Sequence, residues 1–239
     1  MQKFLFIFAH PDDETVGCGG TIKLLTDAGK QVKVISVTNG SAGEVMPEAL
    51  ENLKQYKNLG ELRHSEFVNV CETLGAEAKI LNFEDGQINN QIVWGTLLST
   101  LIDEIEEYQP DVVVTFDHTG WYFHLDHVGV SIAATLAVQK VEPRPSLFFH
   151  VFYQPEGTDA KWHYVFPDRM PITHIVNIEH CRSLKLAAME IHLSQDLNIP
   201  KNDLIKHEVC CENYKLVFSD QNGDKWLSEQ AIFTRPKID

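Results

Sequence analysis

The stretch Phe4-Leu5-Phe6-Ile7-Phe8-Ala9-His10-Pro11-Asp12-Asp13-Glu14 decides the fold class of this chain. Its first five residues are all apolar, which is typical of a strand covered on both faces of a sheet. The polar hexad at residues 9–14 follows directly, and Gly17-Cys18-Gly19-Gly20 indicates that a helix begins soon after it. Catalytic groups collect at the carboxyl ends of parallel strands, so the hexad is a candidate site. The alternative is a solvated turn, because Pro and Asp are common turn residues.

The rest of the chain alternates between predicted strands and predicted helices. Apolar and β-branched runs predict strands at residues 31–38, 78–83, 111–116, 147–153 and 173–178. Apolar residues at helical spacing predict helices at residues 47–74, 98–109, 128–139 and 184–191. This order predicts an α/β fold with a Rossmann-like, mostly parallel sheet and helices on both faces. A chain of 239 residues can bury one large core, so we expect a single domain at 1–239.

Composition narrows the classes of function. The chain has 34 acidic and 20 basic residues and a formal charge of −14, which argues against a general nucleic-acid or anionic-membrane binder. No apolar run reaches the roughly 20 residues of a membrane span, and the start of the chain lacks secretory-signal features. We therefore expect a cytoplasmic protein that acts on a small molecule. Five cysteines without a CxxC pair make a disulfide framework unexpected.

A second polar cluster follows the strand predicted at residues 111–116. It contains His124 and His127, and an Ala-rich helix is expected directly after it. Imidazole and carboxylate are ligands that zinc accepts, and a catalytic zinc site typically combines three protein ligands with one open position. His10, Asp13 and His127 supply such a set, which manganese, iron or cobalt also fits.

The same two clusters hold candidates for proton transfer. Asp12 is the candidate general base, because a carboxylate beside the metal can take a proton from the attacking water. His124 is placed to protonate the leaving group or to stabilise the oxyanion. Asp126 is expected to orient the ring of His124 or His127, and Glu14 is expected to support a ligand from behind.

These motifs resemble the PIG-L/LmbE-like family of metal-dependent N-acetylglucosaminyl de-N-acetylases. The resemblance rests on the hexad and on His124-Leu125-Asp126-His127, and it extends over residues 4–196. Further matching segments are Gly17 to Ile22, Thr38-Asn39-Gly40, Arg63 with Glu66, and His192-Leu193-Ser194-Gln195.

The resemblance implies roles for these residues. His10, Asp13 and His127 would be the zinc ligands, Asp12 the base, and His124 the acid or oxyanion partner. Tyr122 matches a tyrosine that helps to stabilise the oxyanion in some members, but ordinary packing is an equal alternative. Arg63 matches a substrate-contacting arginine, and its alternative is a helix-face salt bridge to Glu66 or Glu61. His192 is a further candidate for substrate binding, and its alternative is a polar helix end. The sequence departs from the family at Phe123, where many members carry glycine.

We therefore expect a zinc-dependent hydrolase that removes an acetyl group from an N-acetylglucosamine-containing substrate. The main alternative is a metal-dependent hydrolase of a different amide or ester, suggested by the aromatic run Trp121-Tyr122-Phe123. A nucleotide-binding module is disfavoured, because the hexad separates the first strand from the glycines. A sugar-binding protein without turnover has no need of Asp12 and His124. The resemblance and the irregular segment at residues 155–171 favour a homo-oligomer.

Overall fold

The computed structural model describes residues 2–152, 170–206, 210–219, 232 and 234–235. Among these residues, seven strands form one sheet in the order β3-β2-β1-β4-β5-β7-β6. The strands are β1 (Lys3–Phe8), β2 (Gln31–Thr38), β3 (Glu77–Phe83), β4 (Val112–Phe116), β5 (Ser146–Val151), β6 (His174–Asn177) and β7 (Cys211–Phe218). The helices are α1 (Asp13–Asp27), α2 (Leu50–Leu53), α3 (Leu59–Leu74), α4 (Gln91–Tyr108), α5 (Gly120–Phe123), α6 (Leu125–Lys140), α7 (Arg182–Ile191) and α8 (Asn198–Lys206).

The sheet is parallel from β3 through β5, and β7 and β6 add an antiparallel edge. This arrangement confirms the predicted α/β, mostly parallel fold. β1 lies in the interior of the sheet between β2 and β4, and its residues from Phe4 to Phe8 are fully buried. The continuous apolar run is explained by this position, because both faces of β1 are covered by helices.

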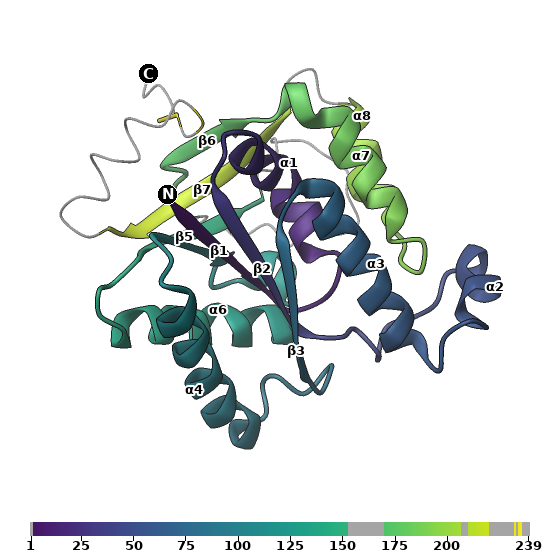
Figure 1. Ribbon diagram of the computed structural model, residues 1–239, viewed down its shortest axis with the longest axis horizontal. Coiled ribbons are helices and arrows are strands. Elements are labelled where there is room, and N and C mark those ends of the chain that lie inside the picture. Colours follow the sequence, from purple (N-terminus) through teal and green to yellow (C-terminus); the bar gives the residue numbers. More distant parts are fainter. Residues whose placement is uncertain (1, 153–169, 207–209, 220–231, 233, 236–239) are drawn as a thin grey trace.

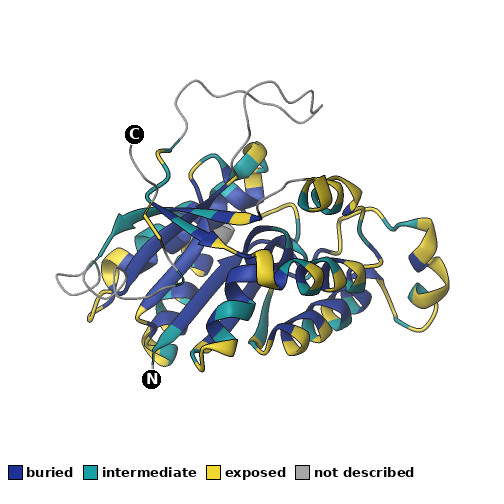
Figure 2. Ribbon diagram, turned by 90° about the horizontal axis from the view of Figure 1, so that it is seen from above, coloured by how far each residue is buried: buried dark blue, intermediate teal, exposed yellow. Residues whose placement is uncertain are grey.

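Helices cover both faces of the sheet (Figure 1). α1, α3 and α7 pack against one another on one face, and α4 and α6 pack together on the other. Figure 2 shows the buried strands between helices whose outer surfaces are exposed. The core therefore lies in two apolar layers, one on each side of the sheet.

Several helix predictions were wrong in their bounds: α4 begins at Gln91 and α6 at Leu125, before the predicted starts at residues 98 and 128. The first helix begins at Asp13, inside the polar hexad, so Asp13 and Glu14 form part of its first turn. Acidic side chains are favourable there because the helix dipole places partial positive charge at the N-terminus. Three glycines lie within this helix, and a Cβ at Gly20 would stand 2.6 Å from the side chain of Ile178. Close packing therefore requires this glycine.

The long helix predicted at residues 47–74 is interrupted. A 3₁₀ turn at Pro47–Ala49 and the short α2 precede α3, which begins only at Leu59. Asn58 caps α3, because its side-chain oxygen accepts the backbone N–H of Glu61 at 3.0 Å. A polar cap inside an otherwise helical pattern starts a new helix.

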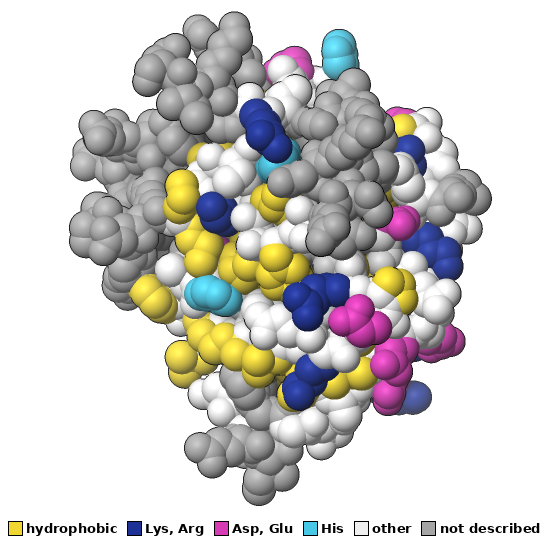
Figure 3. Space-filling view, turned by 90° about the vertical axis from the view of Figure 1, so that its left-hand side faces the viewer, with side chains coloured by type: hydrophobic (Ala, Val, Ile, Leu, Met, Phe, Trp, Pro, Cys, Tyr) yellow, Lys and Arg dark blue, Asp and Glu magenta, His cyan; other side chains and the backbone are white. Residues whose placement is uncertain are grey.

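Figure 3 shows a face on which Lys and Arg side chains lie among apolar ones, without a continuous basic surface among the described residues. Within the described ranges, the helices are too short or too polar to cross a membrane. The five cysteines are free. Nearly all of the irregular segment predicted at residues 155–171 lies outside the described residues.

Candidate active site

The two polar clusters meet at one edge of the sheet. β1 pairs with β4 in parallel, with Phe4 opposite Val112 and Phe6 opposite Val114, so the loops after the two strands lie side by side. The strand order also reverses direction between these two strands. Such a switch point at the carboxyl ends of strands is the usual place for a ligand in an open α/β sheet.

The three predicted metal ligands converge. His10 Nδ1 lies 3.2 Å from His127 Nε2 and 3.5 Å from Asp13 Oδ2. Asp13 Oδ1 lies 3.3 Å from His127 Nε2, and all three side chains are buried. Ligands bonded at about 2.0–2.1 Å in a tetrahedral zinc site are separated from one another by about 3.3 Å. The donor atoms therefore fit a metal ion of this size.

The charges around these atoms favour a cation. Burial opposes the charged form of His10, but hydrogen bonds to Asp126, Asp13 and Asp85 raise its pKa well above the usual value. Burial lowers the pKa of His127 to about 3, so this ring is neutral and able to ligate. Burial would raise the pKa of Asp13, but His127 and His10 outweigh it and lower the pKa to about 2. The site therefore holds carboxylates around a centre where positive charge is stabilised.

Asp12 faces Arg63. The Arg63 guanidinium lies 3.2 Å from Asp12 Oδ2 and donates hydrogen bonds to the carbonyls of Gly40 and Pro11 at 3.0 and 2.5 Å. Burial raises the pKa of Asp12 to about 6, although the charge of Arg63 acts in the opposite direction. The proposed salt bridge from Arg63 to Glu66 or Glu61 was wrong, because this buried arginine reaches the loops at the site.

Asp126 contacts a different histidine from the two that we expected. Its Oδ2 lies 3.3 Å from Nε2 of His10, and its two carboxylate oxygens accept the backbone N–H groups of Gly86 and Ile88. Asp85, which sequence reasoning missed, lies 3.1 Å from the same nitrogen. Asp85 follows β3 at the same edge of the sheet, so its position after a strand was the available signal. His10 thus belongs to two potential donor sets, one with His124 and His127 and one with Asp85 and Asp126.

His124 and Tyr122 lie beside the predicted ligands. The His124 ring is centred 4.8 Å from that of His10 and 4.6 Å from that of His127, and its Nδ1 is buried without a hydrogen-bond partner among the described residues. Burial and the neighbouring His10 lower its pKa. The Tyr122 ring is centred 5.4 Å from that of His127 and is 39% exposed. Burial, followed by Asp13 and Asp12, raises its pKa, so its hydroxyl stays protonated.

The aromatic run before His124 has an unusual backbone. Trp121 and Phe123 have φ values of 67° and 63°, in the left-handed region that bulky residues rarely adopt. The Trp121 ring packs between Phe116 and Phe152, at centroid distances of 4.7 and 4.4 Å. Phe123 is 44% exposed. The run therefore packs the Trp121 ring against the ring of His127, with the centroids 5.4 Å apart, and leaves the Phe123 ring partly exposed.

His192 contacts Glu14, the last residue of the hexad. Its Nε2 is 3.0 Å from Glu14 Oε1 and 3.2 Å from Thr15 Oγ1, and its side chain is completely buried. Glu14 is also fully buried and contacts His192 and Thr15. These contacts join the start of α1 to the loop after α7.

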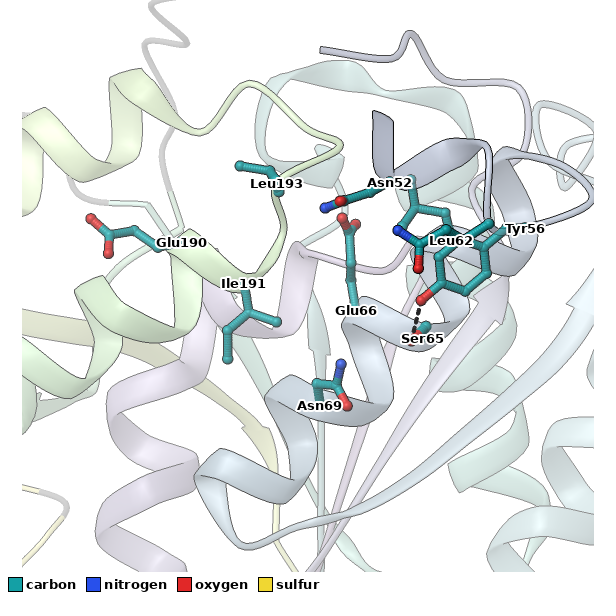
Figure 4. Close-up of a pocket in the computed structure, with 10 residues that line it drawn as sticks. Asn52, Tyr56, Leu62, Ser65, Glu66, Asn69, Glu190, Ile191 and Leu193 are labelled. Carbon is teal, nitrogen blue, oxygen red and sulfur yellow. Dashed lines mark hydrogen bonds between the residues drawn. The ribbon is translucent and has the colours of Figure 1, made fainter. Parts of the chain in front are cut away.

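A separate cavity of about 340 Å³ lies between α3 and the end of α7 (Figure 4). Its polar side chains are mostly uncharged amides and hydroxyls, and none of the predicted metal ligands lines it. Glu66 links it to the loop that carries His192, because its carboxylate accepts hydrogen bonds from Ser194 N at 3.0 Å and Ser194 Oγ at 2.5 Å. The cavity is lined by Asn52, Gln55, Tyr56, Leu62, Ser65, Glu66, Asn69, Glu190, Ile191 and Leu193.

More than half of the chain matches the model of a known family. Residues 5–138 match the PIG-L family model, which is described as GlcNAc-PI de-N-acetylase. The chain belongs to the PIG-L family. The predicted family and the enzyme class, an N-deacetylase, are thereby confirmed.

Individual relatives agree with this membership. The chain is 29% identical over 225 residues to a 1D-myo-inositol 2-acetamido-2-deoxy-α-D-glucopyranoside deacetylase of Saccharomonospora viridis, covering 80% of this chain and 84% of the relative. A zinc-inhibited form of teicoplanin deacetylase has a similar fold, with a TM-score of 0.68 and 18% identity over 89% of this chain and 97% of that one. So has the 4-carboxy-2-hydroxymuconate hydratase of Pseudomonas putida KT2440, with a TM-score of 0.65 and 19% identity over 92% and 98%. The likeness to these two structures extends to the fold alone.

Proposed function

We propose that this PIG-L family member is a zinc-dependent hydrolase that removes the N-acetyl group from a small N-acetylglucosamine-containing molecule. The observation that carries the proposal is the convergence of three side chains: His10 Nδ1 lies 3.2 Å from His127 Nε2, and the two Asp13 oxygens lie 3.5 Å from the first nitrogen and 3.3 Å from the second. The relative from Saccharomonospora viridis, which acts on an acetamido sugar linked to inositol, supports the choice of substrate class.

His10, Asp13 and His127 would hold the metal. The chemistry that a bound zinc ion supplies is polarisation of the amide carbonyl and acidification of the attacking water. Asp12 takes the proton from that water, and a pKa of about 6 suits a base that works near neutral pH. As the amide C–N bond breaks, the proton taken up by Asp12 is passed to the departing sugar amine with His124 as the relay, so that acetate and a free amine are released. The Tyr122 hydroxyl, whose ring lies beside that of His127, would donate a hydrogen bond to the oxyanion.

The test is acetate release from N-acetylglucosamine conjugates. We expect activity in the zinc-loaded protein, loss on chelation and recovery on adding zinc. Asp12→Asn should lower kcat by at least 100-fold while zinc remains bound. Asp111→Asn is the matched control, because Asp111 lies exposed at the opposite end of the sheet and bonds to the backbone of Lys3. Full activity of the metal-free protein or of Asp12→Asn would contradict the mechanism.

The second candidate is a hydrolase of another small amide or ester at the same centre. The specific observation that favours it is Phe123, which exposes an apolar ring directly before His124. Fold similarity to a hydratase supports the view that this scaffold serves more than one reaction. A panel of acetamido sugars, simple N-acetyl amides and acetate esters separates the two. The cytoplasmic location and the homo-oligomer stay predictions, and light scattering in solution tests the latter.

A further inference from the structure

The backbone of Asp12 adopts a conformation that L-residues rarely take. Its φ is 125° and its ψ is −31°. Asp12 occupies the N-cap position of α1, where an aspartate normally accepts a backbone N–H of the first helical turn. Its side chain makes no such hydrogen bond. The carboxylate is turned instead to Arg63, 3.2 Å away.

A buried carboxylate holds this backbone in place. Glu14 Oε2 accepts the backbone N–H of Asp12 at 3.1 Å. Glu14 Oε1 accepts the Thr15 hydroxyl at 2.6 Å and lies 3.0 Å from His192 Nε2. The side chains of Glu14 and His192 are both 0% exposed, so water does not compete for these contacts.

We propose that Glu14 and His192 are positioning residues for the general base, which act by fixing the backbone of Asp12 so that its carboxylate faces the site. Strained conformations persist only where the surroundings over-determine them, and they cluster at functional sites. His192 orients the carboxylate of Glu14 through the 3.0 Å contact at Nε2, and Glu14 orients the N–H of Asp12. The inference rests on the proposed function, in which Asp12 is the base. In this proposal His192 positions Glu14, in place of the predicted contact with the substrate.

The first test is Glu14→Gln, which keeps the size of the side chain and removes its charge. The amide offers a single acceptor oxygen to the Asp12 N–H and the Thr15 hydroxyl, so we expect Asp12 to relax towards ordinary N-cap geometry. We expect kcat to fall at least tenfold, with KM and zinc stoichiometry unchanged. We also expect faster hydrogen exchange at the Asp12 amide, measured by NMR without any substrate.

The second test distinguishes the hydrogen bond from mere packing. His192→Gln keeps a side-chain N–H that can reach Glu14 and should retain most of the activity, whereas His192→Leu should match Glu14→Gln. The double variant Glu14→Gln/His192→Leu should lose little more than either single variant, because the two residues act as one unit.

Glu212→Gln is the matched control. Glu212 is also a buried carboxylate that accepts backbone N–H groups of α1, those of Gly20 and Thr21, and it pairs with buried Lys185 at 2.6 Å. Its loss should lower the melting temperature and leave kcat unchanged. If that variant fails to fold, Glu104→Gln replaces it, since Glu104 is likewise buried and lies 3.2 Å from Lys33.

The outcomes separate the two proposals. Unchanged kcat in Glu14→Gln, or an equal loss of kcat in the folded control, would overturn the positioning role while leaving the deacetylase intact. An inactive zinc-loaded wild type would overturn the proposed function alone, because the exchange rate of the Asp12 amide still tests the hydrogen bond from Glu14. Unchanged exchange in Glu14→Gln would overturn the positioning role whatever the activity.

Discussion

Replacing His150 with phenylalanine should make the protein more resistant to acid. His150 lies near the end of β5, and its ring contacts those of Trp121, Phe152 and Tyr214 at centroid distances of 5.4, 5.0 and 5.6 Å. Its Nδ1 is buried and has no hydrogen-bond partner within the described part of the chain. Phenylalanine keeps the ring contacts and removes the group that titrates.

The magnitude follows from proton linkage. Burial, with a smaller contribution from the charge of Lys185, holds the pKa of His150 well below its ordinary value of 6.5. The unfolded chain therefore binds a proton below that pH that the folded chain does not bind, and stability falls as the pH is lowered. Between about pH 7.5 and about pH 5.5 the loss from this one imidazole is about 1.4 kcal/mol.

Urea denaturation of wild type and His150→Phe at the two pH values measures this difference. We expect wild type to lose about 1.4 kcal/mol more than the variant over the interval. Comparing the two proteins cancels the contributions of the other histidines, which titrate in both. A difference near zero would refute the reasoning, because it would mean that folded His150 takes up the proton and is solvated.

Three further predictions test the site and the fold. Gly120→Ala should destabilise the protein by about 2–3 kcal/mol and weaken metal binding, because φ is +56° and the new Cβ would lie 2.8 Å from a backbone nitrogen of α6. Gly29→Ala is the control: Gly29 has a φ of +72° and lies in open space, so this variant should lose only about 1 kcal/mol of stability. Thermal melting of both variants measures the difference in stability. Arg63→Met should move the acid limb of the kcat/KM profile to higher pH, because the guanidinium lowers the pKa of Asp12 from where burial alone would set it. Asn58→Ala should cost about 1 kcal/mol in urea denaturation through loss of the cap of α3.

Sequence patterns predicted the features that depend on burial and chain order. The apolar run at residues 4–8 indicated a strand covered on both faces, and the alternation of elements indicated a parallel sheet. Both hold because side-chain burial and the connection between parallel strands leave few arrangements. The same reasoning predicted that His10 and His127 lie at one edge of the sheet. In the structure their ring nitrogens are 3.2 Å apart.

Other features depended on contacts between segments distant in sequence. Asp85 follows a predicted strand, but its contact with His10 was not predictable, because His10 is 75 positions earlier in the chain. The break before α3 depended on Asn58 acting as a cap, a choice that helical spacing of apolar residues does not reveal. The contact of His192 with Glu14 spans 178 positions, and the loop after α7 brings the two together.

The early start of α1 explains how one short hexad makes three different sets of contacts. Successive residues of a helix point about 100° apart, which separates Asp13 from Glu14, and the non-helical backbone of Asp12 turns its carboxylate in a third direction. Asp12 turns to Arg63, Asp13 turns to His10 and His127, and Glu14 turns back to His192. In an extended loop the three negative charges could crowd around one centre and repel one another. The helix separates them, so that each is matched by its own cationic or hydrogen-bonding partner.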